Sequence, residues 1–552
     1  MKKIIFSLLI CTFLSCQENR PHGSQYKLPE LTPNNLLMGY LNENRSSYRV
    51  SFYDINIDFD LENKSINGFV TIKAESLNDL RKLQIDLAEN LNISKISYKD
   101  VDLDFSREYD AVLIDFPDDI KKGDIFEFTV FYNGIPQGAD NPPWAGGFTW
   151  SKDKDERDWV AVSCEGEGAR IWWPNKDHIT AEGDSVRMAY TVPSNVVAVG
   201  NGKLRSVKSI NNKSTYEWFV SNPINNYNIS VQIGNYVAVQ DTLIKENEVH
   251  YMNHYVLDYN KELAANYFTQ SKEVIRFYEK YFGDYQWYED GYKLIEVPYL
   301  GMEHQSAVTY GNGFSLYNGV RSKSWPMYGV IDPLIIHETG HEWFGNSVTA
   351  SDPTHIWIHE GMQVYSEALY FEDKFNSYPV SIDYLKSIKS RIQNKIPIVG
   401  PEDENYWALN GDTYMKGAWV MHTLRSAINN DPVWFEILKE FMVENAKSHV
   451  STEDFFNKVK EKTGTDYSYF SEQYFYSSNQ PELEYHQTDS QFYYKWNNVN
   501  DSFIMPIDLL VNGIEKRVLP NRELQSFDIK KHSTVEVMDW KFYVLPVKKD
   551  FK

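Results

Sequence analysis

Cysteine is almost absent from this chain, which has three cysteines in 552 residues, at positions 11, 16 and 164. Because two of them lie in the first sixteen residues, only Cys164 remains beyond that segment. A single cysteine cannot form an internal disulfide, so a disulfide-based scaffold is excluded. No Cys-His pairing surrounds Cys164 in the sequence, which favours a buried or pocket-lining thiol over a nucleophile.

Basic residues are also scarce compared with acidic ones. The 55 lysines and arginines are outnumbered by 77 aspartates and glutamates, which gives a formal net charge of −22. Nucleic-acid binding needs clustered lysine and arginine against the phosphates. No basic run occurs, so we expect no nucleic-acid partner. An acidic surface attracts cationic molecules weakly and favours solubility.

Long apolar runs are missing except for one near the N-terminus. Two lysines precede the run Ile4 to Leu14, which is too short to span a membrane permanently. We therefore interpret residues 1–15 as a signal peptide. The letters FLSC ending at Cys16 resemble a loose bacterial lipobox, which predicts lipid attachment at Cys16. The expected product is an exported, membrane-anchored lipoprotein facing the periplasm or cell surface, and ordinary cleavage with release is the alternative.

The patterns along the rest of the chain predict an α+β multidomain protein, which its length also favours. A polar segment with several prolines is followed by alternating short strands, then by helical periodicity, then by strands again. Between the last strands, Asn512-Gly513 predicts a two-residue hairpin. The predicted units are a tether (16–45), an N-terminal β-domain (46–245), an α-rich domain (246–482) and a small C-terminal β-domain (483–552).

The sequence His337-Glu338-Thr339-Gly340-His341, followed after eighteen residues by Glu360, predicts a zinc site. Two histidines four residues apart lie on one face of a helix, so both rings can reach one ion. A catalytic zinc takes three protein ligands and leaves one position for water. We expect His337, His341 and Glu360 to bind one Zn²⁺ and Glu338 to act as the general base. The preceding Asp332-Pro333 predicts the start of that helix.

A second pair of histidines offers an alternative. His355 and His359 are also four residues apart, and Glu360 follows them directly. No carboxylate lies between the two histidines, so this pair could hold a metal but not easily use it. We interpret His359 as a residue that packs behind the ligands. Glu367, two helical turns after Glu360, could orient a ligand histidine or be solvated or ion-paired.

Four separated segments resemble the aminopeptidase N and leukotriene A-4 hydrolase family of zinc metallopeptidases. They are HETGHEWFGN with WIHEG around the predicted ligands, GMEH at 301–304, YMKGA at 414–418 and CEGEGAR at 164–170. Their order and approximate spacing match the family. The resemblance implies a β-saddle-like N-terminal domain and a thermolysin-like catalytic domain.

By this resemblance the expected activity is that of a zinc aminopeptidase with one Zn²⁺ per chain, acting on peptides that have a free N-terminus. Such an α-amine is largely cationic at neutral pH, because its usual pKa is about 7.7–8.0. Carboxylates at a fixed distance from the metal would anchor it, and the resemblance assigns this role to Glu303 and Glu165. It also assigns substrate contacts to Gly301 and Met302, and stabilisation of the oxyanion to Tyr414.

The residues before Gly301 also suggest how a peptide could bind. The β-prone run Tyr292 to Val297 is interrupted at Pro298 and Gly301. Proline within a sheet is typical of an edge strand. We therefore expect an edge strand beside the metal that can pair with an extended peptide.

Departures from the family pattern leave some alternatives open. His304 and His359 stand where asparagine is frequent, and Thr339-Gly340 replaces the more common Leu-Ala. These changes keep the ligands and the base, but they leave the side-chain preference of the pocket open. Other interpretations are an endopeptidase or an epoxide hydrolase on the same metal. A third is a tethered binding protein with a structural zinc, in which His359 would supply a fourth ligand.

Overall fold

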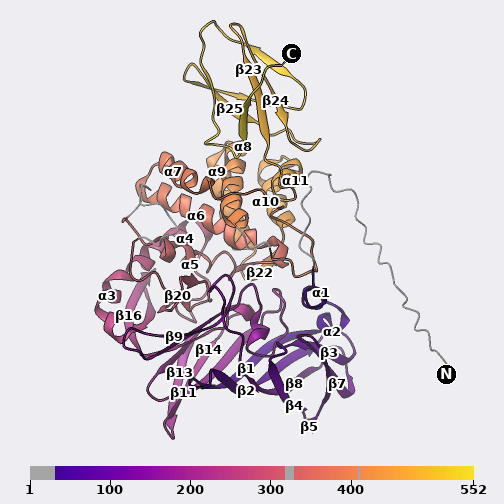
Figure 1. Cartoon of the computed structure of the whole chain (residues 1–552), viewed down its shortest axis with the longest axis vertical. Helices are drawn as coiled ribbons and strands as arrows, with labels where there is room; N and C mark the ends of the chain where they lie inside the picture. The colour runs from indigo at the N-terminus through magenta and orange to yellow at the C-terminus, as the bar shows by residue number, and fades with distance from the viewer. Residues whose placement is uncertain (1–30, 317–328, 408–410, 552) are drawn as a thin grey trace, which may run out of the picture.

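The computed structural model describes residues 31–316, 329–407 and 411–551. Three parts follow one another along the long axis: N-terminal sheets, a helical middle part and C-terminal strands (Figure 1). The predicted α+β class is therefore confirmed. The predicted signal peptide, residues 1–15, and the predicted lipid site Cys16 lie outside the described residues. Within the described ranges, no helix combines the length and apolarity needed to cross a membrane.

The N-terminal part is built from strands whose buried and exposed residues alternate. The strands are β1 (Tyr48–Asp60), β2 (Ser65–Ser76), β3 (Leu80–Asp86), β4 (Leu91–Tyr98), β5 (Val101–Asp102), β6 (Asp104–Glu108), β7 (Ala111–Ile120), β8 (Ile125–Gly134), β9 (Gly147–Lys152), β10 (Asp158–Ser163), β11 (Ser185–Pro193), β12 (Val197–Gly200), β13 (Lys203–Ile210), β14 (Lys213–Val220) and β15 (Val231–Gly234). In β1, Tyr53, Ile55 and Ile57 are buried while the residues between them are partly exposed. Short 3-10 turns lie at Ala169–Ile171 and Asn226–Asn228.

Three sheets result from these strands. The largest has eight strands in the order β13-β14-β11-β1-β2-β8-β4-β5, and the others have the orders β12-β15-β10-β9 and β3-β7-β6. Loop residues 164–168 follow β10 and lead toward the helical part. This loop carries Glu165.

The middle part combines a five-stranded sheet with a layer of helices. The sheet contains β16 (Tyr236–Lys245), β17 (Glu248–Leu257), β18 (Leu294–Glu296), β19 (Gly301–Met302) and β20 (Val308–Tyr310), and a separate pair is formed by β21 (Val348–Ala350) and β22 (Ser448–Val450). The helices of this part are α3 (Lys261–Tyr267), α4 (Gln270–Phe282), α5 (Pro333–Gly340), α6 (Trp357–Phe375), α7 (Tyr378–Lys389), α8 (Gly417–Ile428), α9 (Asp431–Glu444), α10 (Thr452–Thr463) and α11 (Ser468–Tyr474). Short 3-10 turns lie at Asp258–Asn260 and Pro353–His355, and a π-helical turn spans Asp412–Lys416.

The sheet order β16-β17-β18-β20-β19 corrects two expectations. Strand β16 pairs along its whole length with β17, so the middle part begins near residue 236 and not at 246. The alternating pattern of β16 resembles that of the strands before it. Only its pairing with β17 shows that β16 belongs to the middle part. The run Tyr292–Val297 contributes β18, which lies inside the sheet and not at its edge. The edge strand is β19, which pairs with β20 alone.

Helices α5 and α6 bring the predicted ligands together. Helix α5 begins as expected, because the Asp332 carboxylate accepts a hydrogen bond from the Leu334 N–H and Pro333 occupies the first turn. Helix α6 is buried from Trp357 to Phe371. A Cβ placed on Gly361 would lie 3.0 Å from the Cα of Gly417, so only glycine permits this close approach of α6 to the start of α8.

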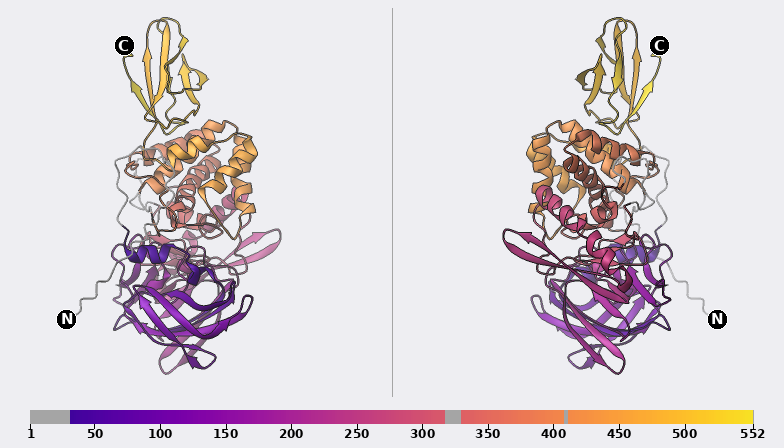
Figure 2. Two further views of the ribbon diagram at one scale, coloured as in Figure 1. Left: turned by 90° about the vertical axis from the view of Figure 1, so that its right-hand side faces the viewer. Right: turned by 90° about the vertical axis from the view of Figure 1, so that its left-hand side faces the viewer.

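The C-terminal strands form two small sheets that share a hydrophobic core with the helices. The strands are β23 (Glu482–Gln487), β24 (Gln491–Asn497), β25 (Ile507–Val511), β26 (Ile514–Val518), β27 (Gln525–Asp528), β28 (Val535–Val537) and β29 (Leu545–Lys548). The two sheets have the orders β27-β24-β23-β29 and β26-β25-β28. The predicted hairpin is confirmed, with Asn512 and Gly513 at φ 51° and 81° between β25 and β26. Figure 2 shows these strands at the end of the molecule opposite the N-terminal sheets, with the helices between them.

The predicted tether, residues 16–45, is wrong from residue 33 onward. Two short helices, α1 (Pro33–Gly39) and α2 (Glu43–Ser46), pack on the N-terminal part. Arg45 is fully buried, donates to the carbonyl oxygens of Met38 and Asp177 at 2.7 Å, and pairs with Asp86 at 3.1 Å. Proline and polar residues are typical of tethers, but they also suit short capped helices, and the composition alone does not separate the two.

Replacing Arg45 tests whether this segment belongs to the fold. Arg45→Met keeps most of the side-chain volume but leaves the buried Asp86 carboxylate without its cation. We expect a loss of about 3–5 kcal/mol in unfolding free energy, measured by urea denaturation. The matched control is Arg49→Met, because Arg49 pairs with Asp184 on the surface and should cost less than about 1 kcal/mol. Equal effects of the two variants would contradict this role of Arg45.

Candidate active site

The three predicted ligands converge on one point. The Nε2 atoms of His337 and His341 lie 3.3 Å apart, and each lies 3.5 Å from Oε2 of Glu360. Ligands arranged as a tetrahedron about 2.1 Å from a zinc ion would lie about 3.4 Å from one another. Oε2 of Glu360 is buried and has no hydrogen-bond partner among the described residues. The donor set, its spacing and this unsatisfied oxygen all fit zinc.

Hydrogen bonds on the far side of each ring orient the two histidines. Nδ1 of His337 lies 2.9 Å from Oε1 of Glu367, whose other oxygen accepts a hydrogen bond from the Tyr384 hydroxyl at 2.7 Å. Nδ1 of His341 lies 2.9 Å from the carbonyl oxygen of Phe344. Both acceptors place the ring proton on Nδ1 and leave Nε2 as the ligand atom. Glu367 is fully buried, so of its two interpretations the one that orients a ligand histidine fits the structure.

Glu338 lies beside the three ligands under a glycine. Its side chain is buried, and burial raises the pKa of Glu338 to about 8. A Cβ on Gly301 would lie 2.8 Å from Oε1 of Glu338, so this position of β19 requires glycine to pack against the carboxylate. Met302 follows in the same edge strand and is also buried.

Tyr414 reaches the same place from the π-helical turn before α8. Its ring lies 6.4 Å from the His337 ring and is inclined to it by 21°. Burial raises the pKa of Tyr414 well above its usual value, so the phenol stays protonated and can donate a hydrogen bond. π-Helical turns occur frequently at functional sites.

Glu165 and Glu303 approach the site from different domains. Glu165 belongs to the loop after β10, and Glu303 follows β19. Both are almost fully buried, and in each carboxylate Oε1 lacks a hydrogen-bond partner among the described residues. Burial raises the pKa of both groups, as does repulsion from neighbouring carboxylates. Together with the ligands, Glu338 and Tyr414, they line a cavity of about 380 Å³.

The sequence analysis missed the residues that hold the Glu303 segment in place. The side-chain amide of Asn346 donates to the carbonyl oxygen of Glu303 at 2.8 Å and accepts from Asn228 at 2.8 Å. Oε1 of Glu342 accepts from the Ser306 N–H at 2.8 Å. Glu342 and Asn346 belong to the same HETGHEWFGN segment as the two histidines, so their position in the sequence could have marked them as site residues. Their role in holding the Glu303 segment depends on tertiary contacts.

The alternative histidine pair does not converge. His355 contacts Thr452 through Nδ1 at 2.9 Å and Glu402 through Nε2 at 3.2 Å. His359 accepts a hydrogen bond at Nε2 from the Ala350 N–H at 2.9 Å. No group of candidate ligands within the described ranges contains both histidines. Because its Nε2 is already an acceptor, His359 cannot act through that atom as a fourth zinc ligand.

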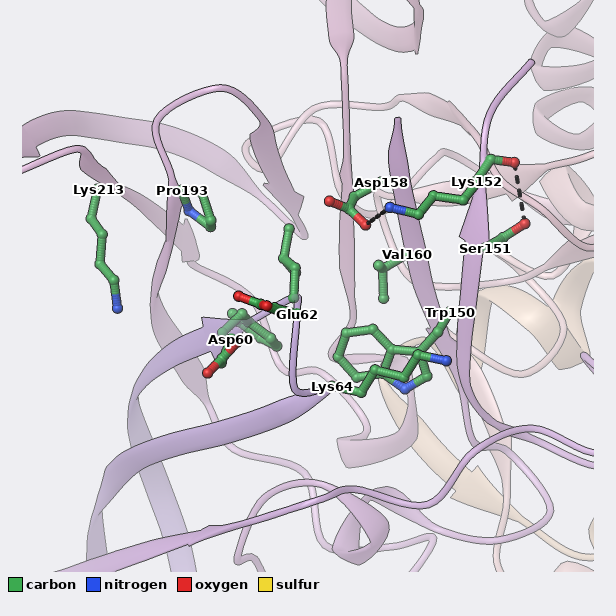
Figure 3. A pocket seen from close by; sticks show the side chains of 12 residues that line it. Asp60, Glu62, Lys64, Trp150, Ser151, Lys152, Asp158, Val160, Pro193 and Lys213 are labelled. Carbon is green, nitrogen blue, oxygen red and sulfur yellow. Dashed lines mark hydrogen bonds and ion pairs between the residues drawn. The ribbon is translucent and has the colours of Figure 1, made fainter. Parts of the chain in front are cut away.

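A larger cavity of about 800 Å³ lies elsewhere, in the N-terminal part. Figure 3 shows Trp150 and Val160 in it, surrounded by acidic and basic side chains. The charges partly neutralise one another, as Lys152 and Asp158 do at 2.6 Å. No histidine or cysteine lines this larger cavity. The predicted zinc ligands and the predicted base line the smaller cavity.

Comparison with known proteins agrees with this geometry. The model of the peptidase family M1 domain matches residues 267–474, and that of the peptidase M1 N-terminal domain matches residues 50–227. These two matches cover both parts that form the cavity. The chain belongs to the M1 peptidase family.

Two curated relatives show how far sequences in the M1 family diverge from this chain. Endoplasmic reticulum aminopeptidase 2 of Homo sapiens is 28% identical over 208 residues, which cover 34% of this chain and 21% of that protein. Leucyl aminopeptidase of Saccharolobus solfataricus is 22% identical over 435 residues, which cover 76% of this chain and 52% of that protein. This chain thus spans about half or less of these two relatives.

Solved structures share the fold. The M1 zinc metallopeptidase of Deinococcus radiodurans has a TM-score of 0.62 and 18% identity, over 76% of this chain and 91% of that chain. A mutant of that protein, described as bound to the substrate Tyr-Ser-Ala, superimposes with the same TM-score of 0.62.

Removing the carboxylate behind His337 should weaken the metal site. Glu367→Ala deletes the acceptor of the Nδ1 proton, and we expect zinc affinity to fall about 10- to 100-fold. Competition with a chromogenic zinc chelator measures this change. Glu367→Gln, which retains an oxygen acceptor, serves as the control and should lose less affinity. Unchanged affinity in the alanine variant would show that Glu367 does not orient the ligand.

Proposed function

We propose that this M1 peptidase is a zinc-dependent aminopeptidase that hydrolyses the N-terminal peptide bond of peptides. One observation carries the proposal: two buried carboxylates, Glu165 and Glu303, line the same cavity as the three predicted ligands and Glu338. Buried carboxylates without a cation are costly, and the α-ammonium of a peptide would neutralise them. The names of the relatives support this activity.

In the proposed reaction, His337, His341 and Glu360 hold the zinc ion. When bound, zinc polarises a carbonyl and makes water more acidic. Glu338 takes the proton from the attacking water, and the raised pKa of its carboxyl suits it to give the proton on to the leaving amine. The Tyr414 hydroxyl donates a hydrogen bond to the developing oxyanion.

Cleavage at the first residue follows from the position of the amine anchor. Glu303 shares a group of closely spaced donor atoms with Glu338 and His341, and Glu165 shares another with Glu303 and His359. We infer that an amine held there brings the bond after the first residue to the metal. The internal peptide bonds that an endopeptidase cuts carry no α-ammonium that would neutralise this pair of buried carboxylates. A structural zinc with His359 as fourth ligand conflicts with the hydrogen bond from Ala350.

We also propose that the protein is exported and anchored by a lipid at Cys16. The support is the N-terminal sequence: two lysines, the apolar run from Ile4 to Leu14 and the letters FLSC. In the sequence, residues 17–32 separate Cys16 from the start of helix α1.

The base is tested by Glu338→Gln. The amide keeps the shape of the side chain but cannot accept the proton from water, so kcat should fall by about 10²- to 10⁴-fold. Zinc content, measured by atomic absorption, should remain at one ion per chain, because Glu338 is not among the ligands. Near-normal turnover in this variant would rule out the proposed base.

The amine anchor is tested with matched substrates. A peptide with a free N-terminus and its N-acetylated form differ only in the cationic amine. We expect the wild-type protein to cleave the free peptide and to leave the acetylated one essentially intact, as measured by chromatography of the products. Equal cleavage of both peptides would favour an endopeptidase and would remove the proposed role of Glu165 and Glu303.

A further inference from the structure

The tautomer of His359 is set by a backbone contact. Its ring is fully buried at the start of α6, and Nε2 lies 2.9 Å from the Ala350 nitrogen, whose N–H points at it. A backbone N–H can only donate, so Nε2 must present its lone pair. A protonated ring would place two N–H groups against each other. The neutral ring therefore carries its proton on Nδ1.

The Nδ1 proton faces Glu165. Nδ1 of His359 lies 3.7 Å from Oε1 of Glu165. Both atoms are buried, and neither has a hydrogen-bond partner among the described residues. Unsatisfied buried donors and acceptors are costly, so a small closure that joins this pair is favourable. Contacts of this kind often shorten when substrate binds.

Gly345 provides the space for this ring. Its φ is 111°, which favours glycine, and a Cβ there would lie 3.1 Å from Nδ1 of His359. The ring thus sits between a glycine of the middle domain and a glutamate of the N-terminal domain. Glu165 belongs to a loop, and a loop carboxylate needs an external contact to fix its direction.

We propose that His359 is a positioning residue for substrate binding: its Nδ1–H holds the Glu165 carboxylate in the orientation that receives the α-ammonium of a peptide. His359 itself touches neither substrate nor metal. It acts across the domain boundary, from α6 to the loop after β10. Glu303 supplies the second carboxylate of the amine site. This inference rests on the proposed aminopeptidase function.

Two substitutions at position 359 test the roles of the two ring nitrogens one at a time. The Nδ2 of an asparagine takes the place of the histidine Nδ1, and the Oε1 of a glutamine takes the place of Nε2. His359→Asn therefore keeps the donor to Glu165 and loses the acceptor for Ala350. His359→Gln keeps that acceptor and loses the donor. Steady-state kinetics on a free-amine peptide, thermal denaturation and zinc content are measured for both variants.

The expected pattern is crossed. In His359→Gln, KM rises about tenfold or more, the range for a hydrogen bond to a charged group, while kcat changes by less than about threefold. In His359→Asn, KM stays close to the wild-type value, but Tm falls because the acceptor for the Ala350 N–H is lost. The same order should appear in the Kd of the free-amine peptide, measured by calorimetry in a Glu338→Gln background with zinc bound. His355→Gln is the control, because His355 contacts Thr452 and Glu402 and should leave KM unchanged.

The outcomes distinguish the inference from the function on which it rests. Equal KM in the asparagine and glutamine variants, or a larger KM in the asparagine variant, would overturn the role of His359 alone. A wild-type protein that cleaves free and acetylated peptides equally would overturn both. A low KM in His359→Asn together with a high KM in His359→Gln supports the positioning role.

Discussion

Buried negative charge is the constraint on which the rest of this structure depends. Four glutamates, at positions 165, 303, 338 and 360, are less than a tenth exposed and line one cavity. Isolated carboxylates in such surroundings are strongly disfavoured unless cations or protons neutralise them. Burial raises the pKa of Glu165, Glu303 and Glu338. Although burial also acts against the ionised form of Glu360, the two histidines hold its pKa well below the usual range. The site is thus built for two cations: a metal ion and an ammonium group.

The fold serves this site by letting backbones approach closely. Gly301 allows the edge strand β19 to lie on Glu338, and Gly361 allows α6 to meet the start of α8 next to Glu360. Gly361 also lies against the Thr413 carbonyl oxygen, in the turn that carries Tyr414 beside His337. The loop that carries Glu165 comes from the N-terminal domain, so the complete site exists only when both domains are packed together. The residue ranges matched by the two M1 domain models both contribute residues to this one site.

The sequence predicts features set by neighbouring residues better than it predicts contacts between distant segments. The two ligand histidines, the adjacent Glu338 and the hairpin at Asn512-Gly513 depend on residues close in sequence, where helix and turn geometry fix the outcome. The role of Glu367 and the tautomer of His359 depend on contacts across the fold, with His337 and with Ala350. The start of the middle domain depends on the pairing of β16, and the packing of residues 33–46 involves the buried ion pair and hydrogen bonds of Arg45. Local sequence patterns do not identify contact partners that lie far away in the sequence.

The most direct test of the central claim is a crystal structure of zinc-loaded protein with anomalous diffraction at the zinc edge. The account predicts one peak per chain, about 2.0–2.2 Å from Nε2 of His337, Nε2 of His341 and an oxygen of Glu360, with one coordination position left to solvent. A peak elsewhere, or a fourth protein ligand that closes the coordination shell, would contradict it.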